Sequence, residues 1–368
     1  MSEVTIEDLP ALAAGAHLLM SGAGQADIEG VLHWVSALLA EHGPVPLVRP
    51  DDVPEDTVCA AVGLVGSVTA QAELPMAGDE PERAVRALEA RLGTQLGAVT
   101  VLDTATVNAL LPVAAAALLG LPLVDCDGMG RVFPLIHQTS YALAGVPLTP
   151  LAAVGATGDT VVLDAADERA ERLLRAAVNV SGGWLFTALY PTTTGTLPRA
   201  GIVGAVSRAL AVGRALLDAA DVDDIAVRLA AQTASRVLGT GRVVDLEHRT
   251  RPADAHYPAH PSSIVVRTHA QPVRSIRLEA QNELLLALVD GALAAAVPDV
   301  ICLIDPHDGS VIDIEAVTVG REVQVVTVPA APVWHTPQGL ALVGPRAFGF
   351  PIRHPREGRV RHPGEVRS

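Results

Sequence analysis

The sequence predicts an α/β fold followed by a second, β-rich α+β domain. Over the first 165 residues, short apolar runs with the composition of buried strands alternate with segments of helical periodicity. That alternation is typical of a mainly parallel sheet with flanking helices. From residue 239 onward, short β runs dominate. A length of 368 residues also favours more than one domain.

In the first 165 residues, the apolar spacing separates helices from strands. We expect helices over 9–20, 28–39, 82–92 and 108–119. We expect strands over 45–48, 58–64, 98–102 and 121–124, followed by a hairpin of 151–154 with 160–163. The hairpin is favoured by the Ala-Thr-Gly-Asp segment between its two strands.

The later part of the chain divides into a helical and a β-rich stretch. Helices are expected over 167–180, 201–220 and 223–238, with one strand over 184–190. Strands are expected over 242–246, 263–268, 275–280, 300–304 and 322–328, with one helix over 283–297. We therefore predict four parts: an α/β domain (1–165), a helical segment packed on it (166–238), a β-rich domain (239–352) and a polar tail (353–368).

Composition excludes several classes of function. All 26 basic residues are arginine, so Schiff-base enzymes, the usual pyridoxal-phosphate enzymes and P-loop NTPases, which need a lysine, are excluded. Residues 1–130 carry 18 acidic residues against four arginines, which argues against nucleic-acid binding. Without a signal peptide, a membrane span or a cysteine framework, a soluble cytoplasmic protein is expected.

The strongest candidate site is the segment that follows the predicted strand 121–124. Asp125 and Asp127 come at the end of this apolar run, and Gly128, Gly130 and Arg131 follow. Carboxylates and glycines after a buried strand are typical of the ligand crevice of an open α/β sheet. The alternative is a turn, in which the aspartates cap the backbone and the glycines supply positive φ.

These residue types suit acid–base chemistry. Residues i and i+2 of a strand face the same side, so Asp125 and Asp127 could converge on one ligand or metal ion. Two close carboxylates raise the pKa of one of them, which favours a general base. Arg131 could orient a carbonyl or carboxylate. His137 is a weaker catalytic candidate, because a lone histidine in an apolar context is more often structural.

Other candidates are weaker. Gly22 and Gly24 lie in a turn that could present backbone N–H groups to a ligand or simply join two helices. This turn lacks the third glycine and the preceding strand of a dinucleotide-binding motif. His256 and His260 have metal-ligand spacing but no nearby carboxylate or cysteine. We expect His335 to pack beside Trp334.

Motifs along nearly the whole chain resemble one known family. The segment Asp-Cys-Asp-Gly-Met-Gly-Arg-Val-Phe-Pro at 125–134 is similar to a motif of the S-methyl thiohydantoin desulfurase-like proteins, a group associated with hydantoin utilisation. Further similarity comes from Ser-Gly-Ala-Gly at 21–24 and from 238–243, 281–283, 298–301 and 344–349. Leu135 departs from the pattern, because a glutamate often follows Phe-Pro in the family.

The resemblance implies a hydrolase that removes methanethiol from an S-methylated thiohydantoin or acts on a related cyclic amide. Within such a reaction we assign Asp125 or Asp127 as the base, Arg131 as the charge-stabilising donor, and Gly22, Gly24, Gly128 and Gly130 as substrate contacts. A divalent metal held by the aspartates and a histidine would do the same work. The alternative is a non-catalytic partner or ligand-binding subunit of a hydantoinase/oxoprolinase-type enzyme. Alanine-rich helices make a homodimer plausible.

Overall fold

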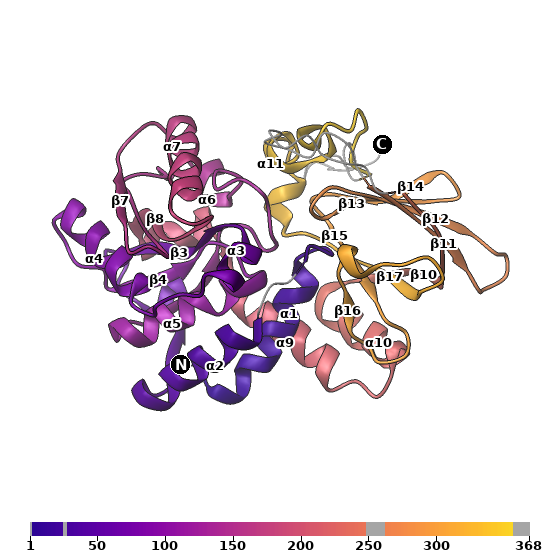
Figure 1. Cartoon of the computed structure of the whole chain (residues 1–368), viewed down its shortest axis with the longest axis horizontal. Helices are drawn as coiled ribbons and strands as arrows, with labels where there is room; N and C mark the ends of the chain where they lie inside the picture. The colour runs from indigo at the N-terminus through magenta and orange to yellow at the C-terminus, as the bar shows by residue number, and fades with distance from the viewer. Residues whose placement is uncertain (1, 25–27, 248–261, 356–368) are drawn as a thin grey trace, which may run out of the picture. The chain divides into compact units, whose positions relative to one another are not determined.

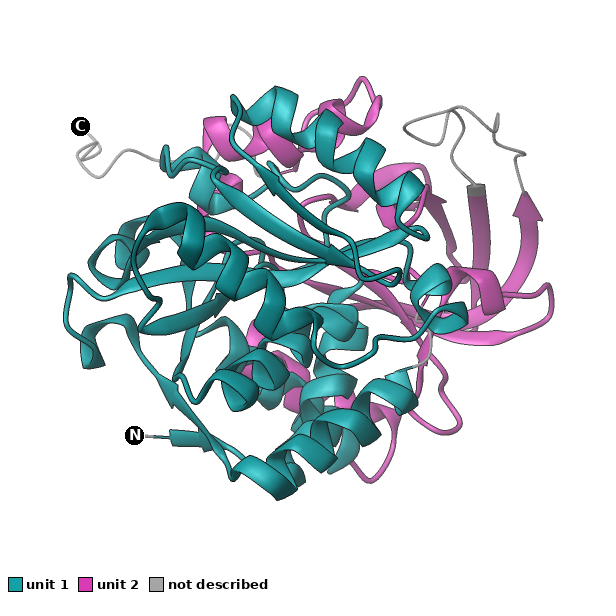
Figure 2. Ribbon diagram, turned by 60° about the vertical axis from the view of Figure 1, so that its left-hand side comes forward, with its two compact units in different colours: residues 1–20, 25–218 teal, residues 21–24, 219–368 magenta. Residues whose placement is uncertain are grey.

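The chain forms two compact units. The computed structural model describes residues 2–24, 28–247 and 262–355. Unit 1 comprises residues 1–20 and 25–218, and unit 2 comprises residues 21–24 and 219–368 (Figures 1 and 2). The sequence predicts boundaries at 165 and 238, whereas the main division between the two compact units falls between Asp218 and Ala219.

Among the described residues, unit 1 contains a mixed nine-stranded sheet. Its strand order is β1-β2-β5-β4-β3-β8-β6-β7, and β9 pairs with β5. The strands are β1 (Ser2–Val4), β2 (Val45–Val48), β3 (Val58–Gly66), β4 (Ala98–Val101), β5 (Leu123–Asp127), β6 (Leu151–Gly155), β7 (Thr160–Leu163), β8 (Trp184–Thr193) and β9 (Ile202–Val203). Only the block β2-β5-β4-β3 is parallel, so the expected α/β character is confirmed while the mainly parallel sheet is not.

The antiparallel strands enter the sheet from the second half of unit 1. Strand β8 pairs antiparallel with both β3 and β6, and β6 forms the predicted hairpin with β7. Strands β1 and β9 pair antiparallel with β2 and β5. Helices also separate β7, β8 and β9 along the chain, so helix–strand alternation alone does not distinguish parallel from antiparallel neighbours here.

The helices of unit 1 confirm most of the expected positions. They are α1 (Leu9–Leu19), α2 (Ile28–His42), α3 (Val68–Glu73), α4 (Glu80–Leu92), α5 (Leu111–Leu119), α6 (Ser140–Leu143), α7 (Asp167–Val180), α8 (Leu197–Ala200) and α9 (Ala205–Leu217). A short 3-10 helix, η3 (Thr106–Ala109), precedes α5. The backbones of α1 and α9 pack closely at Gly15. A Cβ atom at this position would lie 1.9 Å from the carbonyl oxygen of Ala209, so the contact requires glycine.

Among the described residues, unit 2 is built on an eight-stranded antiparallel sheet. Its order is β14-β13-β12-β11-β10-β17-β15-β16. The strands are β10 (Arg236–Glu247), β11 (Ser262–Thr268), β12 (Ser275–Ala280), β13 (Leu284–Val289), β14 (Ala292–Ala296), β15 (Val300–Ile304), β16 (Val311–Ile312) and β17 (Glu322–Val328). Two helices, α10 (Val222–Thr233) and α11 (Pro337–Val343), accompany them. This confirms the β-rich character expected of the later chain.

Two helix predictions in this part are wrong: the helix expected over 283–297 does not form, and the helix expected over 223–238 ends earlier than expected. The segment 283–297 forms the hairpin β13–β14, because Asp290 and Gly291 adopt φ values of +50° and +81°. Two positive φ angles at an Asp-Gly pair are typical of a type I′ hairpin turn. Helix α10 ends at Thr233, after which Ala234 is left-handed and β10 begins. In the part of the chain that the structure describes, no helix combines the length and apolar character that crossing a bilayer requires.

Candidate functional site

The loops after β4 and β5 meet at one edge of the sheet of unit 1. The two strands are parallel neighbours, so their carboxyl ends lie on the same side. The backbone N–H of Gly128 donates to the carbonyl oxygen of Leu102 at 3.1 Å, which joins the two loops directly. A Cβ atom on Gly128 would lie 2.8 Å from the ring of Tyr141, so this approach requires glycine.

Asp127 is the centre of this junction. Its side chain is fully buried and accepts hydrogen bonds from the Thr104 backbone N–H (2.9 Å), the Thr104 hydroxyl (2.7 Å) and the Gly130 N–H (2.9 and 3.0 Å). Gly130 has a φ of +68°, which glycine adopts without strain. Burial raises the pKa of Asp127 to about 6, although these hydrogen bonds and the charge of Arg208 oppose the rise.

Asp103 is a second buried carboxylate at the same edge. It follows β4 and accepts a hydrogen bond from the Asn108 amide at 2.7 Å and from the Ala105 N–H at 3.2 Å. Burial raises the pKa of Asp103 to about 7, and the negative charge of Asp127 contributes to the rise. Sequence analysis missed Asp103, although it stands just after the expected strand 98–102.

Asp125 serves a different segment from Asp127. Its carboxylate accepts from the backbone N–H groups of Val206 (2.9 Å) and Ser207 (3.2 Å) and from the Ser207 hydroxyl (2.5 Å). These groups belong to the first turn of α9, whose unpaired N–H groups attract a carboxylate. The two aspartates of β5 therefore direct their hydrogen bonds to different parts of unit 1.

Arg131 and His137 contact groups other than Asp125 and Asp127. Arg131 is 1 % exposed, donates from Nε to the carbonyl oxygen of Val132 at 2.9 Å, and places its guanidinium 5.0 Å from the centre of the Phe133 ring. His137 Nδ1 lies 3.4 Å from a carboxylate oxygen of Glu171 on α7. Burial alone would raise the pKa of Glu171, but its contacts with His137 and Arg175 outweigh burial and lower it. Catalytic roles for Arg131 and His137 stay predictions.

The glycines predicted to contact substrate divide between the two units. Gly128 and Gly130 belong to unit 1, whereas Gly22 and Gly24 belong to unit 2. The segment 21–24 is fastened there: the Gly22 carbonyl oxygen accepts from the Ile314 N–H at 2.8 Å, and the Ser21 hydroxyl accepts from the Ile301 N–H at 3.1 Å. These bonds hold the turn against β15 and the segment before β17.

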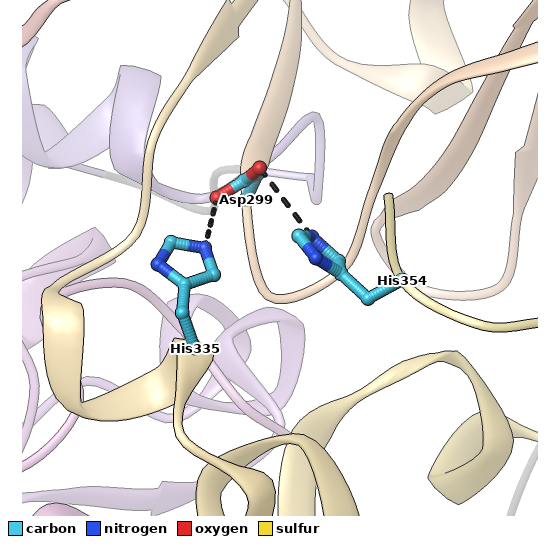
Figure 3. A group of neighbouring side chains, drawn as sticks. All are labelled: Asp299, His335 and His354. Atoms are coloured by element: carbon cyan, nitrogen blue, oxygen red, sulfur yellow. Dashed lines mark hydrogen bonds and ion pairs between the residues drawn. The ribbon is translucent and has the colours of Figure 1, made fainter. Parts of the chain in front are cut away.

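Unit 2 contains a cluster of potential metal ligands, shown in Figure 3. Asp299 lies between two histidines: His335 Nε2 is 2.8 Å from Oδ1, and His354 Nε2 is 3.5 Å from Oδ2. Sequence analysis expected His335 to pack beside Trp334 and assigned His354 to the polar tail. His354 is instead 2 % exposed. His256 and His260 lie outside the described residues.

Two family models together match nearly the whole chain. The model described as "S-Me-THD-like, N-terminal domain" matches residues 7–165, and the model described as "S-Me-THD-like, C-terminal domain" matches residues 165–356. The chain belongs to the S-Me-THD-like family. The resemblance noted from the sequence motifs is thereby confirmed, and the two models meet at residue 165.

One solved structure shares the fold of this S-Me-THD-like protein. It is the crystal structure of a protein from Chromobacterium violaceum, with 23 % sequence identity and a TM-score of 0.74. The match covers 93 % of this chain and 95 % of that chain. No curated protein matches this sequence.

Proposed function

We propose that this protein is a hydrolase that removes the methylthio group from an S-methyl thiohydantoin or a related small cyclic amide. The observation that carries the proposal is the pair Asp103 and Asp127, at the carboxyl ends of two parallel strands, in a chain of the S-Me-THD-like family. Environments that place two neighbouring carboxyl pKa values near neutral pH are the usual source of an acid and a base in one site.

The reaction needs a base, an acid and a means of stabilising charge. Water adds to the ring carbon that carries sulfur, and the carbon–sulfur bond then breaks as a new carbonyl forms. One proton of the water ends on the ring nitrogen and the other on methanethiol, so no oxidant or reductant is required. A positioned base that removes a proton from water typically accelerates such a step by about 10²–10⁴-fold.

Asp127 is the better base and Asp103 the better acid. Burial raises the pKa of Asp127 to about 6 and that of Asp103 to about 7, so near neutral pH the pair can hold one ionised and one protonated carboxyl. Asp127 Oδ1 accepts the Gly130 N–H at 2.9 Å, and a carboxylate oxygen can accept two hydrogen bonds. Arg131 stays in the proposal as the positive charge of the same loop.

The deciding experiment is incubation of the purified protein with S-methyl thiohydantoins and hydantoins, followed by a thiol assay and mass spectrometry of the ring product. Asp127→Asn should lower kcat by at least about 100-fold. The pH–rate profile should be bell-shaped, with two apparent pKa values near neutral pH that belong to the Asp103–Asp127 pair. Asp103→Asn should lose the alkaline fall, because Asn cannot ionise.

Asp125→Asn is the matched comparison on the same strand. We expect this variant to keep the turnover rate within a few fold of wild type, because the Asp125 carboxylate accepts hydrogen bonds from the first turn of α9. Circular dichroism of each variant separates loss of chemistry from loss of fold. Absence of methanethiol and of any ring product from the wild-type protein would rule out the hydrolase and favour the non-catalytic subunit.

A further inference from the structure

The cluster of Asp299, His335 and His354 is assembled from three separate segments of unit 2. Asp299 lies in the turn between β14 and β15, His335 ends the 3-10 helix η6 (Pro332–His335), and His354 follows η7 (Pro345–Phe348). One ligand atom from each residue lies within 4.8 Å of the others. In Figure 3 the two histidine rings lie side by side, and a dashed line joins each ring to a different oxygen of Asp299.

From this geometry we propose that Asp299, His335 and His354 bind one divalent transition-metal ion. Two imidazole nitrogens and one carboxylate oxygen are the donor set of many zinc enzymes and of non-haem iron sites. In a tetrahedral zinc site with bonds of roughly 2 Å, neighbouring donor atoms are about 3.3 Å apart. The observed His–Asp separations are of similar size but end on different carboxylate oxygens: His335 Nε2 is 2.8 Å from Oδ1, and His354 Nε2 is 3.5 Å from Oδ2.

The surroundings suit a cation. His335 and Asp299 each expose 12 % of their side chains, and His354 exposes 1 %, so the donors are largely withdrawn from water. The backbone N–H of Ala330 donates to Asp299 Oδ1 at 2.9 Å and holds the carboxylate in place, as hydrogen bonds to ligating carboxylates do in known metal sites. The rings of the two histidines lie 5.2 Å apart between centroids, with an interplanar angle of 39°.

Within the described ranges, three protein donors gather at this site, and three donors leave room in the coordination sphere for water. Structural zinc sites are closed by four protein ligands, whereas sites with three donors hold water or substrate in the remaining position. A metal ion here would therefore carry an exchangeable water. This inference does not depend on hydrolysis at Asp127, and each is tested separately.

Metal content decides the proposal. The full-length protein is stripped with chelator, incubated with zinc chloride, separated from free metal and analysed by inductively coupled plasma mass spectrometry. We expect one zinc ion per chain, a rise in Tm on adding zinc, and cobalt(II) absorption bands typical of mixed nitrogen and oxygen donors. A wild-type protein that retains no stoichiometric zinc or cobalt would overturn the proposal without any variant.

Substitutions test the ligand set. His335→Ala and His354→Gln should each weaken zinc binding by at least about 100-fold. Replacing a residue that only hydrogen-bonds to a metal ligand already lowers metal affinity by about 10–100-fold. His269→Ala is the matched control, because His269 also faces a carboxylate, that of Glu322, but lies outside the cluster. Equal zinc binding by wild type and both cluster variants would overturn the assignment of ligands, and circular dichroism verifies that each variant is folded.

Discussion

Asp127 in unit 1 and Asp299 in unit 2 are both buried carboxylates, yet their pKa values move in opposite directions. Asp127 faces the N–H and O–H groups of Thr104 and Gly130, and burial outweighs these neutral donors, so its pKa rises to about 6. Burial also acts to raise the pKa of Asp299, but hydrogen bonds from His335, His354 and Ala330 outweigh it and hold the pKa well below the usual range.

The contrast shows that partners, more than burial, decide what a buried carboxylate can do. At Asp127 burial outweighs both the neutral donors and the charge of Arg208, and a carboxylate in that setting keeps a pKa near neutral pH and can exchange a proton during turnover. A carboxylate between two imidazoles stays anionic throughout the physiological range and suits a permanent cation. The protein thus contains one centre suited to proton transfer and one suited to metal binding.

The largest effect should come from Asp299. With chelator present, Asp299→Asn should lower the free energy of opening around β15 and β17 by about 3 kcal/mol, because a buried carboxylate hydrogen-bonded to one imidazole and paired with a second is lost. Since the folded pKa of Asp299 is lowered, its contribution is present above about pH 4 and is lost as the pH falls further. Hydrogen exchange at pH 7 measures the cost, and urea unfolding at pH 7 and pH 3 measures its decline.

Asp223→Asn is the control for this prediction. Asp223 is exposed in the first turn of α10, also in unit 2, and its substitution should change stability by less than about 0.5 kcal/mol. A cost for Asp299→Asn that grows toward acid pH would contradict the assigned direction of the pKa shift.

The opposite pH dependence is expected of Asp103. Its folded pKa, about 7, is raised, so its stabilising contribution is fully present below about pH 4 and is lost as the pH rises toward 7. Asp103→Asn removes this pH-dependent loss of stability, because Asn does not ionise. Relative to wild type, the variant should therefore gain about 2 kcal/mol in unfolding free energy between pH 5 and pH 8, at about 1.4 kcal/mol for each pH unit in which the groups differ.

Urea unfolding at several pH values measures this gain. Asp51→Asn, at an exposed position of unit 1, should follow the wild-type pH dependence throughout. If the unfolding free energies of Asp103→Asn and wild type depended on pH in the same way, Asp103 would ionise in the folded protein as readily as in water. The pKa of Asp103 would then not be raised, and the contrast between the carboxylates of this site and Asp299 would lose that support.

Local patterns predicted much of this fold. Helix α7 occupies 167–180 as expected, and α1, α2 and β2 agree closely, because apolar spacing and caps are properties of a single segment. The antiparallel pairing of β8 with β3 could not be predicted, since it depends on tertiary contacts between distant segments. The hairpin β13–β14 was missed because alanine and leucine favour helix, although the Asp290-Gly291 turn was visible.

The candidate sites divide in the same way. Asp127 and Gly130 could be predicted together because they belong to one strand and its loop. Asp103 joins them only through the pairing of β4 with β5, which the sequence does not state. His354 was out of reach because it meets Asp299 through the return of the chain from η7, and no local spacing connects the two.

The smallest expected effect concerns Asp125, and it separates the two aspartates of β5. Asp125→Ala removes the acceptor for two N–H groups and one hydroxyl in the first turn of α9, which should cost about 1–2 kcal/mol. Asp125→Asn keeps one acceptor and loses the charge at the helix N-terminus, so its cost should be about 0.5–1 kcal/mol. Hydrogen exchange in peptides of α9, compared with peptides of β3, measures both values. Lower protection of α9 with turnover kept would give Asp125 a structural role. Unchanged protection with turnover lost would instead place Asp125 beside Asp127 in the chemistry.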